Sequence, residues 1–164
     1  MRNGTLYFFC GKMGAGKTTE SKVVASSENA VLISEDEWLS ILYPNQINTF
    51  EEYLQYSSRL KPLIYTHVVS ILKAGSNVVM DFPANTEKQR EWYIKLSGFA
   101  GAQSKLIYLK ASDELCLKQI ASRRIEQPER AKFDTRIVFN EVNKFFQEPS
   151  ESGGLNIQVI EKDA

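Results

Sequence analysis

The chain has 164 residues, 43% apolar and 24% charged, which is long enough for one well-buried domain and too short for two. Its 20 basic side chains balance its 20 acidic ones, and this neutrality argues weakly against a broad nucleic-acid-binding surface. No apolar run approaches the roughly 20 residues of a membrane span, and the N-terminus shows no secretory pattern. We therefore expect a cytoplasmic protein without a membrane partner. The sequence leaves its oligomeric state open.

The first predicted element is a strand that leads into a glycine-rich loop. Thr5–Cys10 is a short run of β-forming residues, and residues 18–27 contain no Gly or Pro and favour a helix. Between them, Gly11-Lys12-Met13-Gly14-Ala15-Gly16-Lys17-Thr18 matches G-x-x-x-x-G-K-[ST] at every fixed position. The alternative is a chance glycine turn. Because strand, loop and helix occur together, the pattern predicts a site for a nucleoside triphosphate.

Residues 11–18, the phosphate loop, have predicted roles at the phosphates. Glycines let backbone N–H groups close around the β-phosphate, and the helix N-terminus adds partial positive charge. Lys17 is expected to reach the β- and γ-phosphates, and the Thr18 hydroxyl to bind Mg²⁺. The predicted nucleotide-binding residues are Gly11, Met13, Gly14, Ala15, Gly16, Lys17, Thr18, Thr19 and Arg124.

Strand-like and helix-like segments alternate through the rest of the chain, which predicts a mostly parallel sheet with helices on both faces. Further strands are expected at residues 30–33, 77–81, 105–109 and 155–159. A helix is expected over residues 50–74, with Pro62 breaking or restarting it. The later helices have cap signals: Thr86 with Gln89 forms a capping box, Ser112 precedes the next helix, and Asp134 is a plausible cap for the last.

Carboxylates follow two of these strands at the sheet edge where parallel α/β proteins bind ligands. Asp81 closes the third strand and is predicted to bind Mg²⁺, the alternative being a turn former before Pro83. Glu35, Asp36 and Glu37 follow the second strand. Any one of them could orient an acceptor hydroxyl or take its proton, and all three could instead begin a helix.

The set Gly11…Lys17-Thr18, Ser34-Glu35-Asp36-Glu37-Trp38, Asp81 and Arg123-Arg124…Arg130 resembles the P-loop kinases of the polynucleotide kinase type. That group includes chloramphenicol phosphotransferase, zeta-toxin-like kinases and AAA_33-type ATP-binding domains. The resemblance implies a P-loop NTPase fold, an α/β/α sandwich whose five-stranded sheet has the order 2-3-1-4-5, and Asp36 as the catalytic base. Leu39 stands where those enzymes have an arginine for the acceptor phosphate, which argues against nucleic-acid chemistry.

Residues 123–133 are the candidate lid, because Pro128 breaks a helix there and arginines can bridge phosphate oxygens. Arg123 and Arg130 are predicted to stabilise charge on the transferring γ-phosphoryl group, with Arg124 in reserve. The alternative is a solvated basic helix end that interacts with its own dipole.

These observations predict a single domain over residues 1–164, with an acceptor insert at 38–75 and the lid at 123–133. We expect a kinase that uses ATP and Mg²⁺ to phosphorylate a hydroxyl group of a small-molecule acceptor. The catalytic residues would be Lys17, Asp36, Arg123 and Arg130, and the metal ligands Thr18 and Asp81. The alternatives are a kinase acting on a nucleic-acid 5′ end or a nucleotide-sugar, and a non-catalytic nucleotide switch.

Three further features of the sequence bear on the ligands. Asn143-Lys144-Phe145-Phe146 lacks the Asp of guanine recognition at its fourth place, which favours an adenine nucleotide. The insert carries aromatic residues that could stack on a planar acceptor or pack in the core, namely Trp38, Tyr43, Tyr53 and Tyr56. The single histidine, His67, is expected to be a packing or surface residue.

Overall fold

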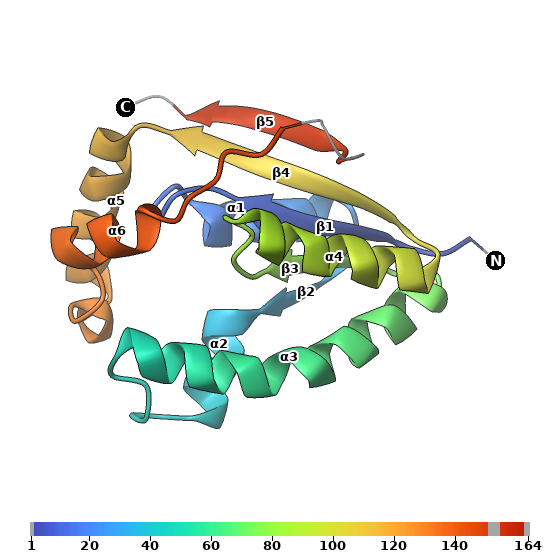
Figure 1. Cartoon of the computed structure of the whole chain (residues 1–164), viewed down its shortest axis with the longest axis horizontal. Helices are drawn as coiled ribbons and strands as arrows, with labels where there is room; N and C mark the ends of the chain where they lie inside the picture. Colours follow the sequence, from blue (N-terminus) through green and yellow to red (C-terminus); the bar gives the residue numbers. More distant parts are fainter. Residues whose placement is uncertain (1, 151–154, 163–164) are drawn as a thin grey trace.

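The computed structural model describes residues 2–150 and 155–162, which fold around a five-stranded sheet with the order β2-β3-β1-β4-β5 (Figure 1). The strands are β1 (Thr5–Cys10), β2 (Ala30–Ser34), β3 (Asn77–Asp81), β4 (Gln103–Ala111) and β5 (Ile157–Lys162). Each pairs in parallel with its neighbours. The predicted fold class and strand order are therefore confirmed. β1, β2 and β3 start at the predicted residues, whereas β4 extends beyond residues 105–109 at both ends. β5 begins two residues later than the predicted 155–159 and ends three residues beyond it.

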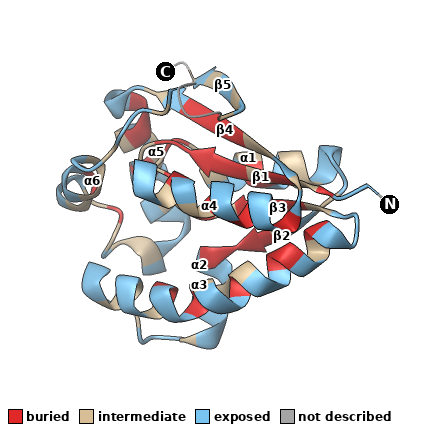
Figure 2. Ribbon diagram, turned by 45° about the vertical axis from the view of Figure 1, so that its right-hand side comes forward, coloured by how far each residue is buried: buried red, intermediate tan, exposed pale blue. Residues whose placement is uncertain are grey.

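Helices cover both faces of this sheet. They are α1 (Lys17–Ser27), α2 (Glu35–Leu42), α3 (Phe50–Lys73), α4 (Glu87–Ala100), α5 (Asp113–Glu126) and α6 (Arg136–Asn143), with a 3₁₀ turn η1 (Pro128–Arg130). Successive strand residues point to opposite faces. Accordingly, Phe8 packs in a cluster with α3 and α4, whereas Phe9 packs in a second cluster with α5 and α6. Figure 2 shows the buried strands between helices whose outer faces are exposed.

α3 runs through Pro62 without a break, so the predicted interruption is wrong. A proline inside a helix removes one hydrogen bond and costs about 3 kcal/mol. Pro62 is exposed, and so is Ser58, the residue whose carbonyl oxygen lacks its usual donor because of the proline. Leu60 and Ile64, on either side of it, are buried in the cluster beneath α3. Packing of this apolar face, about 1.5–3 kcal/mol for each fully buried side chain, outweighs the cost of the proline.

The predicted insert comprises most of α2, the connection after it and α3, and the predicted lid comprises the end of α5, η1 and the turns that follow. In Figure 1 the arrowheads of β4 and β5 point toward the side of the molecule where α5 and α6 lie. Residues 123–133, the predicted lid, therefore lie at the carboxyl edge of the sheet. Within the described ranges, no helix combines the length and apolar character needed to span a membrane.

Candidate functional site

The strand order brings three strand ends together at the carboxyl edge of the sheet. β1 ends at the phosphate loop, β2 ends at the start of α2, and β3, which lies between them, ends at Asp81. Ser34 of β2 lies opposite Asp81, and its hydroxyl donates a hydrogen bond of 3.2 Å to the Asp81 carboxylate. The candidate acidic residues and the phosphate loop therefore belong to one site.

The phosphate loop has the backbone that its glycines predict. Gly14 has φ +83° and Gly16 has φ +98°, values that residues with a side chain rarely adopt. A Cβ on Gly14 would lie 2.6 Å from the carbonyl oxygen of Cys116, so α5 leaves no room for a side chain there. Gly16 also serves as the N-cap of α1. The N–H groups that open this helix are thus free of competing cap side chains and suit an anion.

Two asparagines, which sequence reasoning missed, hold the first half of the loop. Asn85 Oδ1 accepts a hydrogen bond of 2.9 Å from the Gly11 N–H, and Asn143 Oδ1 accepts one of 3.2 Å from the Met13 N–H. Asn85 also donates its own N–H to Gln89, within the capping box that begins α4. In the sequence, the position of Asn85 directly before that capping box was the one signal that could have pointed to it. Asn143 had none, because α6 reaches the loop only in the folded chain.

Lys17 and Asp81 influence each other across the site. Burial lowers the pKa of Lys17, and nearby acidic groups, including Asp81 and Asp36, oppose that shift. Burial likewise raises the pKa of Asp81, while hydrogen bonds from Thr18 and Ser34 and the charge of Lys17 oppose it. The Lys17 ammonium donates a hydrogen bond of 2.7 Å to the Gly11 carbonyl oxygen. Each of these partly buried charges therefore has partial compensation and would gain from a ligand of opposite sign.

The oxygens of Thr18 and Asp81 fit Mg²⁺. Both are hard oxygen donors, and the carboxylate lies in surroundings that penalise its unpaired charge. No group of three or more His, Cys, Asp or Glu residues that could enclose a metal ion occurs in residues 2–150 and 155–162. Mg²⁺ is usually held by one or two protein oxygens together with phosphates and water.

The three adjacent acidic residues have different environments. Glu35 is buried, where its carboxylate accepts hydrogen bonds from Tyr53 and, at 2.7 Å, from Ser57, and burial raises its pKa. Asp36 is exposed, and its Oδ2 lies 3.7 Å from Nη1 of Arg130 in the lid. Glu37 is exposed. Glu35 therefore joins α2 to α3, and Asp36 is the member of the cluster that faces the lid.

A buried carboxylate holds both of the predicted lid arginines. Arg123 donates to Asp134 through Nη2 at 2.6 Å and Nε at 3.0 Å, and Arg130 Nε donates to it at 3.3 Å. The Asp134 side chain is fully buried. It does not cap α6, as its position had suggested, because Thr135 accepts the capping hydrogen bond from Val138. Arg124, the third arginine named in the prediction, is exposed.

The insert contacts both the lid and the core. Lys132 of the lid donates a hydrogen bond of 2.7 Å to Asn48 Oδ1, in the connection between α2 and α3. The aromatic residues of the insert are partly buried against the core, and the ring centroids of Tyr43 and Tyr56 lie 4.2 Å apart. This arrangement favours packing over stacking on an acceptor. His67 is exposed on α3.

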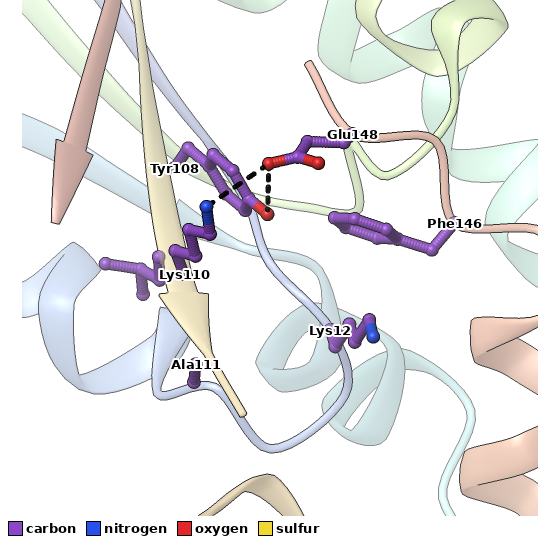
Figure 3. Close-up of a pocket in the computed structure, with 7 residues that line it drawn as sticks. Lys12, Tyr108, Lys110, Ala111, Phe146 and Glu148 are labelled. Carbon is purple, nitrogen blue, oxygen red and sulfur yellow. Dashed lines mark hydrogen bonds and ion pairs between the residues drawn. The ribbon is translucent and has the colours of Figure 1, made fainter. Parts of the chain in front are cut away.

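A cavity of about 400 Å³ lies beside the phosphate loop, next to the end of β4 (Figure 3). Its charged side chains are already paired, because Lys12 contacts Asp113 at 2.8 Å and Lys110 contacts Glu148 at 3.7 Å. None of the predicted catalytic residues lines it. The predicted catalytic residues therefore lie outside this cavity.

The AAA domain family AAA_33 matches residues 6–149. A candidate kinase from Chloroflexus aurantiacus J-10-fl has a TM-score of 0.75 and 21% identity, covering 98% of this chain and 86% of that one. Kti12 from Chaetomium thermophilum, solved with ADP-AlF3, has a TM-score of 0.68 and 20% identity, covering 96% and 89%. The APS kinase CysC of Mycobacterium tuberculosis, solved with AMPPNP and APS, has a TM-score of 0.66 and 16% identity, covering 100% and 91%. A search of curated proteins gave no match. At these identities, the likeness establishes the fold.

Proposed function

We propose that this chain, which belongs to the AAA_33 family of AAA domains, is a phosphotransferase that moves the γ-phosphoryl group of ATP to a hydroxyl group of a small-molecule acceptor. The observation that carries the proposal is the proximity of a complete phosphate loop to two separate carboxylates. Asp81, at the end of β3 beside β1, accepts a hydrogen bond from Thr18 of the loop, and Asp36 follows β2 at the same edge of the sheet. Relatives in fold solved with AMPPNP or ADP-AlF3 support an adenine nucleotide as the donor.

Nucleotide binding would use the backbone of the phosphate loop and Lys17. The N–H groups at the start of α1 would donate to phosphate oxygens, and the ammonium of Lys17 would exchange the Gly11 carbonyl for the β- and γ-phosphates. Because burial disfavours the Lys17 charge, a phosphate anion would stabilise that charge. Mg²⁺, held by the oxygens of Thr18 and Asp81, would neutralise charge on the phosphate oxygens.

Asp36 is proposed to act on the acceptor. The acceptor oxygen forms a bond to the γ-phosphorus, the bond from that phosphorus to the bridging oxygen breaks, and ADP leaves with the electron pair. The hydroxyl proton passes to the Asp36 carboxylate, or is oriented by it until transfer is advanced. Exposure of Asp36 leaves it accessible to an acceptor, whereas the Glu35 carboxylate is committed to Tyr53 and Ser57.

The lid arginines would stabilise charge on the transferring group. Arg123 uses two N–H groups on Asp134, and its remaining donors can meet phosphate oxygens. Arg130 lies between Asp134 and Asp36, which brings a guanidinium next to the proposed base. Such pre-oriented cations accelerate transfer because they need little rearrangement as charge develops.

The test is acceptor-dependent ADP production with ATP and Mg²⁺. A library of metabolites and antibiotics with free hydroxyl groups is screened, together with an RNA oligonucleotide that has a 5′ hydroxyl. The proposal expects at least one small molecule to raise ADP production, with Asp36→Asn abolishing the increase. Acceleration by the RNA alone would indicate a nucleic-acid kinase. ADP production that no acceptor changes would indicate a nucleotide-dependent switch and contradict the proposal.

A further inference from the structure

The last residue of α6 contacts the phosphate loop. Asn143 Oδ1 accepts the Met13 N–H, and Met13 immediately precedes Gly14, whose φ of +83° shapes the loop. The N–H of Met13 is a donor and needs an acceptor, so this bond identifies the atom that faces Met13 as the oxygen of the Asn143 side-chain amide and not its nitrogen. Asn143 therefore restrains the backbone at the point where the loop turns.

The nitrogen of the Asn143 side-chain amide, in contrast to its oxygen, makes no hydrogen bond to the described residues. Asn143 Nδ2 is shielded from solvent and has no hydrogen-bond partner among the residues described. A buried donor without a partner is unfavourable. The amide is therefore kept in this orientation by what its oxygen does for Met13, at the expense of its own nitrogen.

The other end of α6 adjoins the lid arginines. Asp134, which holds Arg123 and Arg130, comes directly before Thr135, the N-cap of α6. In between, Phe139 is buried in the cluster that contains Cys116 and Ile120 of α5. The eight-residue helix α6, held in the core by Phe139, thus connects Asp134 and its two arginines to the phosphate loop.

From this connection we propose that Asn143 is a positioning residue of the phosphate loop, and that α6 couples occupancy of the loop to the lid arginines. The inference rests on the proposed nucleotide binding. Phosphates that draw on the N–H groups of the loop would fix Met13 and Asn143, and through α6 would fix Asp134. The arginines would then be held in one arrangement when the nucleotide is present.

The chain offers a matched control for the test. Asn140 lies on the same helix, is exposed, and has the same side chain as Asn143. Binding of AMPPNP with Mg²⁺ is measured by calorimetry for the wild type, Asn143→Ala and Asn140→Ala. Loss of one net hydrogen bond predicts about tenfold weaker binding for Asn143→Ala, with Asn140→Ala unchanged. Asn143→Ser, which moves the oxygen nearer the backbone, replaces the alanine variant if that variant does not fold.

Hydrogen exchange in residues 123–133 tests the coupling separately. At saturating AMPPNP, these amides should slow in the wild type and in Asn140→Ala but slow less in Asn143→Ala. A structural role alone would lower the stability of the free protein and leave affinity and saturated exchange unchanged, and that result would overturn the inference. No AMPPNP binding by the wild type would overturn the proposed function as well, which distinguishes the two failures.

Discussion

Nη1 of Arg130 lies 3.7 Å from Oδ2 of Asp36, so the lid contacts the first turn of α2 across the carboxyl edge of the sheet. More than half of the Asp36 side chain is exposed, at 58%, and an ion pair of this kind contributes at most about 1 kcal/mol to stability. The ion pair therefore matters for the position of the two side chains more than for stability. It brings a guanidinium and the proposed base together on the side from which an acceptor can approach.

Lys17→Ala should weaken ATP binding or abolish turnover without unfolding the domain. The variant removes the cation that faces the phosphates, and because burial disfavours that charge in the free protein, its loss costs little stability. Calorimetry with ATP and Mg²⁺ measures the affinity. Lys22→Ala, at an exposed lysine five residues further along α1, is the control. Equal affinity and activity in Lys17→Ala would contradict the assignment.

Asp36→Asn should lower phosphoryl transfer by about 10²–10⁴-fold while ATP affinity stays near that of the wild type. The substitution keeps the shape of the side chain and removes its basic oxygen. Steady-state rates with an acceptor identified by the screen give the comparison, and Glu37→Gln, an exposed neighbour, is the control. A larger loss in Glu37→Gln would mean that the base is the other exposed carboxylate.

Arg123→Ala and Arg130→Ala should lower turnover more than ATP affinity, because the charge they meet develops fully in the transition state. Asp134→Asn should have the same signature, since it loosens both guanidiniums at once. Turnover and nucleotide affinity are measured for all three, with Glu129→Gln in the exposed part of η1 as the control. Wild-type turnover in both arginine variants would show that the contacts of these arginines with Asp134 serve the structure and not phosphoryl transfer.

Glu35→Gln should change how stability depends on pH. Burial raises the pKa of Glu35 above its ordinary value of 4.5, so between 4.5 and the raised pKa the folded state binds more protons than the unfolded state. The contribution of Glu35 to the free energy of unfolding of the wild type therefore falls as pH rises from 4.5 to the raised pKa. The neutral variant lacks this loss. Urea unfolding from pH 4 to 8 should show Glu35→Gln gaining stability relative to the wild type as pH rises, and parallel curves would contradict the expectation.

Local patterns predicted most of the elements, because the interactions that form them lie within a few residues. The capping box of Thr86 and Gln89 and the Ser112 cap are present as expected. The predictions at Pro62 and Asp134 are wrong because distant contacts outweighed local preference at both places. Packing of α3 offsets the proline, and two arginines take the carboxylate that could have capped α6.

The sequence by itself determined the phosphate loop and the placement of Asp81 at the end of a strand, because spacing and strand ends are properties of the chain. It could not supply Asn143, which is 130 residues from Met13, and for Asn85, 74 residues from Gly11, it offered only a position beside the capping box. Nor could it separate Glu35 from Asp36, since adjacent carboxylates of equal charge point in different directions on a helix. Only the tertiary structure decided that Glu35 turns into α3 and Asp36 toward the lid, because burial of one carboxylate requires the hydroxyl groups of Tyr53 and Ser57.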